Sequence, residues 1–183
     1  FEGVGGAGMS QEKYTYKKYS PKFRAWFRAE RAKLVKAFPR GTVIAHVGST
    51  AVPGLGGKGI IDIAIETPKK KAKDFVGKAS KLGFVYKKYP GDASRKFMDK
   101  IVRYAGKERR VHLHLTLDKN FLDSFLAVRD YLRVDKAARE EYAAVKKEAA
   151  AQAKKGRTYW KHKAAVLSKL HERAMKVYVG GKK

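Results

Sequence analysis

The sequence predicts an α+β (α/β-like) fold, a mixed β-sheet flanked by helices, with a helical C-terminal part at about residues 119–179. β-branched and apolar runs at residues 42–47, 59–66, 97–104 and 111–117 are typical of strands. Apolar residues recur at helical spacing between and after these runs. With 183 residues the chain is long enough for one sizeable core, so we expect a single domain over residues 12–179.

The first helix and strands follow from local signals. Ser20-Pro21 is typical of a helix start and predicts a helix over about residues 21–38. Small residues follow the strand at 42–47 and form a loop, and the strand at 59–66 follows that loop. Thr67-Pro68 repeats the start signal and predicts a helix that stops at Gly83, followed by a short edge strand in "FVYKKY".

The two later strands are separated by "AGKERR", a loop short enough for a hairpin. In the second of them, the two-residue alternation places His112, His114 and Thr116 on one face and three leucines on the other. Three helices are then expected, with N-caps at Asp118 or Asn120, at Asp135 and at Thr158.

Composition restricts the class of partner. Lys and Arg number 43 against 17 Asp and Glu, a net charge of +26 that attracts phosphate-bearing ligands, RNA among them. The absence of cysteine excludes disulfides, zinc thiolate sites and cysteine nucleophiles. No apolar run approaches the roughly 20 residues that span a bilayer, so we expect a cytoplasmic protein without membrane contact. Residues 1–11 are expected to be a disordered leader or expression scar.

The loop after the first strand is a candidate phosphate site. Gly48, Ser49 and Thr50 follow the strand as small residues whose backbone amides and hydroxyls can approach a phosphate closely, and Lys58 can add a charge. Its spacing is not that of a Walker A loop, and the same glycines also suit a purely structural turn.

The next strand carries the candidate metal ligands. Asp62, Ala64 and Glu66 share a face, so Asp62 and Glu66 are candidate ligands for Mg²⁺ or Mn²⁺, while Ala64 offers none. If the strands are neighbours, four residues converge on that face as a catalytic or transition-metal group: His46, Asp62, His112 and His114. The alternative is that the histidines are half-buried sheet residues with hydrogen-bond partners.

The stretch "HVGSTAVPGLGGKGIIDIAIE" resembles the signature of the GrpB family, within the nucleotidyltransferase fold superfamily. "YSPKFRAWFRAE", "VHLHLTL", "FLAVRDYLR" and "YWKHKAAV" are also similar to that family, so the resemblance extends over roughly Tyr19 to Ala174. It implies that Gly48-Ser49 is the superfamily's phosphate-holding turn and that Asp62 is its first metal-binding carboxylate. Ala64 departs from the pattern, because active members carry a second carboxylate there.

The resemblance implies further that the segment from His112 to His114 stands where the third carboxylate is found. GrpB domains also resemble a domain fused to some dephospho-coenzyme A kinases, which points to coenzyme A or a nucleotide as ligand. Arg109 is a further candidate for neutralising charge. The residues expected to bind nucleotide or phosphate are Gly48, Ser49, Thr50, Lys58, Arg110, Arg129, Tyr159 and Lys163.

Three functions remain open at this point. The first is a nucleotide-binding protein that transfers a nucleotidyl group from a nucleoside triphosphate to an acceptor with Mg²⁺ or Mn²⁺. The second is a catalytically inactive basic module that binds RNA or another ligand on the same fold, with affinity that falls steeply with salt. The third is a hydrolase or isomerase with one metal bound by histidines and Asp62.

Overall fold

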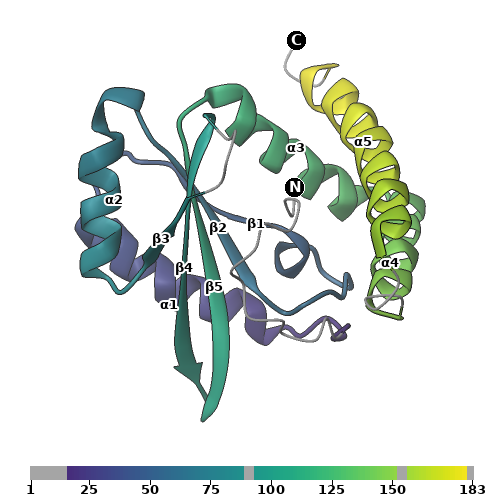
Figure 1. Cartoon of the computed structure of the whole chain (residues 1–183), viewed down its shortest axis with the longest axis horizontal. Helices are drawn as coiled ribbons and strands as arrows, with labels where there is room; N and C mark the ends of the chain where they lie inside the picture. The colour runs from purple at the N-terminus through teal and green to yellow at the C-terminus, as the bar shows by residue number, and fades with distance from the viewer. Residues whose placement is uncertain (1–15, 89–92, 152–155, 181–183) are drawn as a thin grey trace.

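The computed structural model describes residues 16–88, 93–151 and 156–180, without the side chains of residues 149, 156–165 and 179. Its strands form one mixed sheet in the order β1-β2-β5-β4-β3 (Figure 1). β2 and β5 pair in parallel, and the other neighbours pair antiparallel. The bounds are β1 (Ile44–Val47), β2 (Ile61–Glu66), β3 (Val85–Lys87), β4 (Arg95–Tyr104) and β5 (Lys107–Thr116). The predicted α+β class is therefore confirmed.

The helices form two groups, one from the first half of the chain and one from the second (Figure 1). The first group is α1 (Lys22–Ala37) and α2 (Ala72–Lys81), the latter preceded by a short 3-10 turn at Lys69–Lys71. The second group is α3 (Lys119–Val134), α4 (Lys136–Ala151) and α5 (Gly156–Gly180). None of the described helices is long and apolar enough to cross a bilayer.

The main core lies between α1, α2 and one face of the sheet. Ile61, Ile63 and Ile65 of β2 alternate along the strand and are 0% exposed, because every second side chain points to this face. They pack with Leu113 of β5 and with apolar side chains of both helices, including Phe75. The intervening residues, Asp62 among them, therefore point to the opposite face.

That opposite face is partly covered by α3. Leu122 packs on Val47 and Ala64 in a small cluster that joins the helix to β1 and β2. A second cluster unites the loop after β1 with α3, α4 and α5 through Val52, Leu132 and Leu170. The C-terminal helices are thus held against the candidate phosphate loop by apolar burial.

Three local predictions are wrong, the first being the cap at Thr158, which lies inside α5 and not before it. "AGKERR" is not a loop: β4 and β5 continue to Tyr104 and from Lys107, and Ala105-Gly106 alone form the turn. Both turn residues have positive φ, 48° and 73°, the geometry of a two-residue hairpin that twists with its strands. Thr67 does not cap α2, since its hydroxyl donates to the Ile65 carbonyl and the helix begins at Ala72.

Other boundaries agree more closely with the sequence. Asp118 accepts a hydrogen bond from the Asn120 amide and caps α3, and Asp135 accepts one from the Ala138 amide at the start of α4. The expected edge strand is β3. Residues 1–11 lie outside the described part of the chain.

Candidate functional site

Asp62 and two histidines form a hydrogen-bonded group in the middle of the sheet. Asp62 of β2 stands directly opposite His112 of parallel β5, and His114 is two residues further along the same face. Asp62 Oδ1 lies 3.1 Å from His112 Nδ1 and 3.5 Å from His114 Nε2. Burial raises the pKa of the Asp62 carboxyl, but the two histidine hydrogen bonds outweigh it and hold that pKa well below its usual range.

Arg95, at the start of β4, determines which nitrogen of His114 carries the proton. Its Nη1 lies 3.1 Å from His114 Nδ1, and a guanidinium has donors only, so Nδ1 must accept. Burial lowers the pKa of His114 to about 4, which keeps the ring neutral near pH 7. The single ring proton therefore sits on Nε2, directed at Asp62.

His112 is oriented from the other side of the carboxylate. Because ionised Asp62 can only accept, His112 Nδ1 donates to it. His112 Nε2 is buried without a hydrogen-bond partner among the described residues, and the ring stands edge-on to Phe97 at a centroid distance of 4.9 Å. Within the described part of the chain, this nitrogen is the polar atom of the group that is left unsatisfied.

Ala64 is part of the apolar core beneath α3. Its side chain is 0% exposed and packs with Val47 and Leu122. Phe125 of the same helix continues this apolar wall and lies 4.9 Å from the His114 ring. Ala64, where the sequence departs from the resembled pattern of two carboxylates, is therefore enclosed by helix packing.

The donor atoms of Asp62, His112 and His114 lie within 4.8 Å of one another, which makes the group a possible metal site by proximity. Mg²⁺ does not fit it, because Mg²⁺ requires oxygen ligands in near-ideal octahedral geometry. Mn²⁺ and zinc accept imidazole, but a ligating nitrogen must be free of its proton. Both nitrogens that face Asp62 carry one, so the three side chains satisfy each other.

The turn after β1 lies against Asp62. Gly48 has φ 70° and ψ −172°, and a Cβ built there would collide with the Asp62 carboxylate, so only glycine fits. The chain then forms a short 3-10 turn at Ser49–Ala51. The sequence-predicted phosphate turn and Asp62 are thus brought together.

Lys146 of α4 joins this turn, a residue that the sequence did not single out. It is 1% exposed, and its Nζ lies 4.8 Å from the Tyr142 ring centroid. A Cβ built on Gly57 would lie 2.6 Å from Ser49 Oγ and 3.4 Å from Lys146 Nζ. A hydroxyl, an ammonium group and a bare glycine backbone therefore adjoin one another.

His46 does not belong to the Asp62 group, and the predicted convergence of four residues is wrong on this point. His46 pairs with Ile63, so it points to the core face, where its ring stacks on Phe27 at 4.5 Å. Its Nε2 lies 3.0 Å from Thr50 Oγ1, whose own proton is donated to the Ile60 carbonyl. His46 is a structural support of the turn.

The predicted arginines divide between two places. Arg129 of α3 donates to the His46 carbonyl and pairs with Asp130, which ties the helix to the end of β1. Arg133, which the sequence did not indicate, donates to the Ala51 carbonyl. Arg110 instead pairs with Asp99, and Arg109 lies over the Trp26 ring.

The remaining predicted residues lie away from Asp62 or outside the description. Lys58 is half-buried in the loop that precedes β2. Glu66 is exposed at the far end of β2, outside the group of Asp62, His112 and His114. Tyr159 and Lys163 belong to α5, but their side chains lie outside the described residues.

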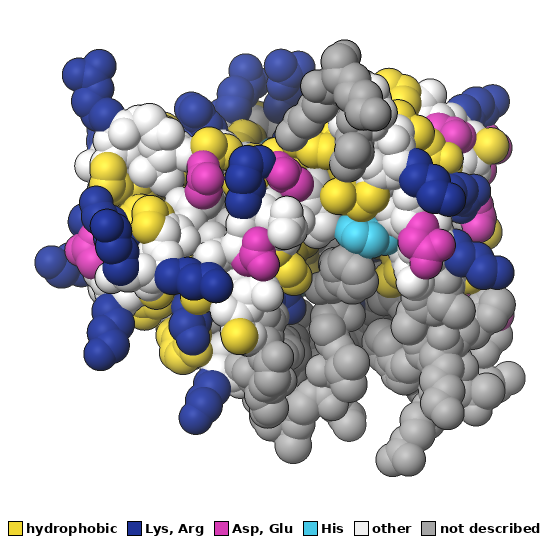
Figure 2. Space-filling model, turned by 90° about the horizontal axis from the view of Figure 1, so that it is seen from above, with side chains coloured by type: hydrophobic (Ala, Val, Ile, Leu, Met, Phe, Trp, Pro, Cys, Tyr) yellow, Lys and Arg dark blue, Asp and Glu magenta, His cyan; other side chains and the backbone are white. Residues whose placement is uncertain are grey.

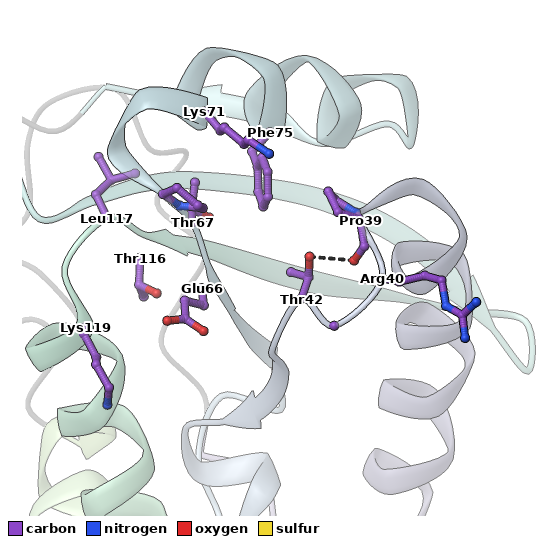
Figure 3. A pocket seen from close by; sticks show the side chains of 12 residues that line it. Pro39, Arg40, Thr42, Glu66, Thr67, Lys71, Phe75, Thr116, Leu117 and Lys119 are labelled. Atoms are coloured by element: carbon purple, nitrogen blue, oxygen red, sulfur yellow. Dashed lines mark hydrogen bonds between the residues drawn. The ribbon is translucent and has the colours of Figure 1, made fainter.

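Glu66 borders a separate open pocket of about 490 Å³. Figure 3 shows its side chain beside Thr116 and on the side of Lys119, with Arg40 at the opposite rim. The Thr42 hydroxyl donates a hydrogen bond to the Pro39 carbonyl, and the Thr116 hydroxyl donates one to the Ile65 carbonyl. Glu66 thus faces this pocket and does not join Asp62.

Comparison with protein families gives a match over most of the chain. The family model described as GrpB protein matches residues 14–173. UPF0157 protein YqkA of Bacillus subtilis is 34% identical over 137 residues, 73% of this chain and 39% of YqkA. UPF0157 protein BH1888 of Halalkalibacterium halodurans is 29% identical over 139 residues, 74% of this chain and 69% of BH1888. The chain therefore spans about two fifths of YqkA.

Solved structures share the fold. A crystal structure described as conserved protein GrpB from Enterococcus faecalis matches with a TM-score of 0.74 and 25% identity, over 90% of this chain and 99% of that one. The Cid1 poly(U) polymerase, in a form bound to MgATP, matches with a TM-score of 0.51 and 17% identity, over 72% of this chain and 44% of that one. The fold is therefore nucleotidyltransferase-like.

Proposed function

The chain belongs to the GrpB family, and from that premise we propose that it binds the phosphate groups of a nucleotide at the turn Gly48–Ala51. The ligand class is a nucleoside triphosphate or a coenzyme A-like molecule. The Lys146 ammonium and the backbone amides of the turn meet the negative charge of the phosphates, without a resident Mg²⁺ ion. Both ligand types are cytoplasmic metabolites, so the proposal includes a cytoplasmic location.

The observation that carries the proposal is the meeting of Ser49, Gly57 and Lys146 at one point. Small residues let backbone amides approach an anion, and a short helical turn orients its first amides outward. A buried ammonium is the complement that a phosphate oxygen requires. Related evidence comes from the fold, since the Cid1 structures are described as bound to MgATP and MgGTP.

The proposal stops at binding. Two-metal nucleotidyl transfer needs carboxylates grouped around two cations. Here Asp62 hydrogen-bonds to His112 and His114, and Ala64 is buried in an apolar cluster. The described residues therefore support phosphate binding more strongly than they support metal binding.

Calorimetric titration with ATP, GTP, CTP, UTP and coenzyme A, each with Mg²⁺ and with a chelator, tests the proposal. Lys146→Gln should weaken binding roughly 10- to 100-fold, the value of a hydrogen bond to a charged group. Lys147→Gln is the matched control: it removes the same charge from the next, exposed position of α4 and should leave affinity within about threefold. Circular dichroism and thermal melts show whether each variant is folded.

Two results would overturn the proposal: no binding of any of these ligands, or an equal loss in both lysine variants. Asp62→Asn separates direct from metal-bridged binding. If phosphates meet the turn directly, removing a negative charge should preserve or improve affinity. If binding needs Mg²⁺ and disappears in Asp62→Asn, the ligand is held through a cation and the metal-free form of the proposal is wrong.

A further inference from the structure

The outer sides of α1 and α2 carry many exposed cations. Both helices pack on the same face of the sheet through the main core, so their other sides face solvent. The exposed positions on these sides are largely Lys and Arg, among them Arg24, Arg28, Arg31, Lys36 and Lys73, and the 3-10 turn before α2 adds the exposed Lys69 and Lys70. We call this surface the α1–α2 basic face.

Acidic residues do not neutralise this face. α1 and α2 contain one acidic residue each, Glu30 and Asp74. Glu30 is 0% exposed and pairs with Lys100 and Lys33, and Asp74 pairs with Lys78. Among the described residues, no carboxylate forms an ion pair with the seven cations named above.

The C-terminal helices differ in charge pattern. There, several cations are paired with neighbouring acids: Lys119 with Asp123, Arg129 and Arg133 with Asp130, and Arg173 with Glu141. Figure 2 shows the molecule from above, with Lys and Arg side chains projecting at both ends and acidic side chains among them. The ion pairs of the C-terminal helices offset part of the positive charge there, whereas the seven cations named for the α1–α2 basic face have no such partners in the part of the chain that the structure describes.

We propose that the α1–α2 basic face binds the phosphate backbone of double-stranded nucleic acid without reading its sequence. Unpaired cations on a nucleic-acid surface release condensed counterions, which drives association. α1 has 16 residues and extends over about 24 Å, the length of about 7 base pairs. The face lies on the opposite side of the sheet from Asp62, so it is separate from the proposed nucleotide site.

The side chains favour a duplex over other polyanions. Val35 is the one large exposed apolar residue of α1 and α2, so the face lacks the apolar side chains with which surface helices enter a membrane. Its aromatic residues, Phe23, Trp26, Phe27 and Phe75, are buried or half-buried in the core and are not available to stack on single-stranded bases. What remains is charge, which suits a regular phosphate backbone.

The test uses fluorescence anisotropy with labelled duplexes of DNA and RNA, about 20 base pairs long, over a series of KCl concentrations. One variant carries Gln at Lys36, Lys69, Lys70 and Lys73. The matched control carries Gln at four exposed lysines of the C-terminal helices: Lys119, Lys136, Lys169 and Lys176. Both variants lose the same charge, and thermal melts check that both fold.

We expect the first variant to flatten the slope of log affinity against log salt by up to about 3.6, since each of the four lost duplex contacts removes about 0.9. Its affinity near 100 mM salt should fall at least tenfold, while the control stays within about threefold. Equal losses in the two variants would overturn the proposal, because binding would then follow net charge alone. Tighter binding to single strands than to duplexes would also overturn it. So would binding to anionic vesicles as tight as binding to duplexes, if the first variant abolishes it. The result does not depend on nucleotide binding at Ser49 and Lys146.

Discussion

The buried ring of His46 predicts a specific loss of stability in acid. Burial, with smaller contributions from Arg133 and Arg129, lowers the pKa of His46 to about 4, although Asp62 acts in the opposite direction. In the unfolded chain the imidazole regains its ordinary pKa of about 6.5. The unfolded state therefore binds the proton more tightly than the folded state, and acid favours unfolding.

The size of the effect follows from the two pKa values. Stability from this group is complete above the unfolded value, and it declines as the pH falls from about 6.5 towards about 4. At pH 5 the unfolded imidazole is almost fully protonated and the folded one is about one tenth protonated. The difference corresponds to about 2 kcal/mol of unfolding free energy.

His46→Gln removes the pH-dependent contribution of this imidazole to stability and keeps a hydrogen-bond donor for Thr50. At pH 7.5 the variant should be less stable than the parent by about 1 kcal/mol, because it loses the stacking on Phe27. At pH 5 the parent has lost about 2 kcal/mol that the variant does not lose, so the variant should then be the more stable protein by about 1 kcal/mol. Urea unfolding of both proteins at both pH values measures the change. A gap that is the same at pH 5 and pH 7.5 would refute the reasoning.

Three other changes test the architecture around Asp62 and α1. Arg95→Met should free His114 to change tautomer, so calorimetry should detect zinc binding that the parent lacks; zinc binding by the parent would contradict the hydrogen-bond assignment. Ala64→Asp should destabilise the fold by about 3 kcal/mol or more in urea, without nucleotidyl transfer, because it buries a charge under α3; a stable variant with transferase activity would contradict this. Glu30→Gln should reduce unfolding free energy by about 3 kcal/mol, because Lys100 stays buried without its counter-charge, whereas a loss below about 1 kcal/mol would show the pair to be dispensable.

The main elements could be predicted because their patterns depend on local sequence. β2 alternates Ile61, Ile63 and Ile65 with polar or small residues, and the structure buries all three on one face. The same alternation placed His112 and His114 together on the face opposite the leucines of β5. Where a face is buried, a shift of one residue would reverse every side chain, so register is strongly specified.

Pairing between distant segments was less accessible. The sequence could not show that β1 pairs antiparallel to β2 with His46 opposite Ile63, which turns His46 away from Asp62. Arg95 meets His114 only because a two-residue turn at Ala105-Gly106 sets the register of β4 and β5. Reading "AGKERR" as a loop concealed that register. Lys146 gave no local signal, since a lysine on a polar helix usually faces solvent.

Ala64 shows why a residue type must be interpreted with its surroundings. In the sequence it marks a missing metal ligand, as if one substitution had inactivated an otherwise complete site. In the structure two further features accompany it. Leu122 packs over Ala64, and Arg95 hydrogen-bonds to His114 and so places a positive charge near the Asp62 carboxylate. Replacing one residue cannot restore a two-metal centre when helix packing and hydrogen bonding both occupy its place. The same features leave the glycine turn and Lys146 intact, so the phosphate-binding part of the fold can persist without its metal-binding part.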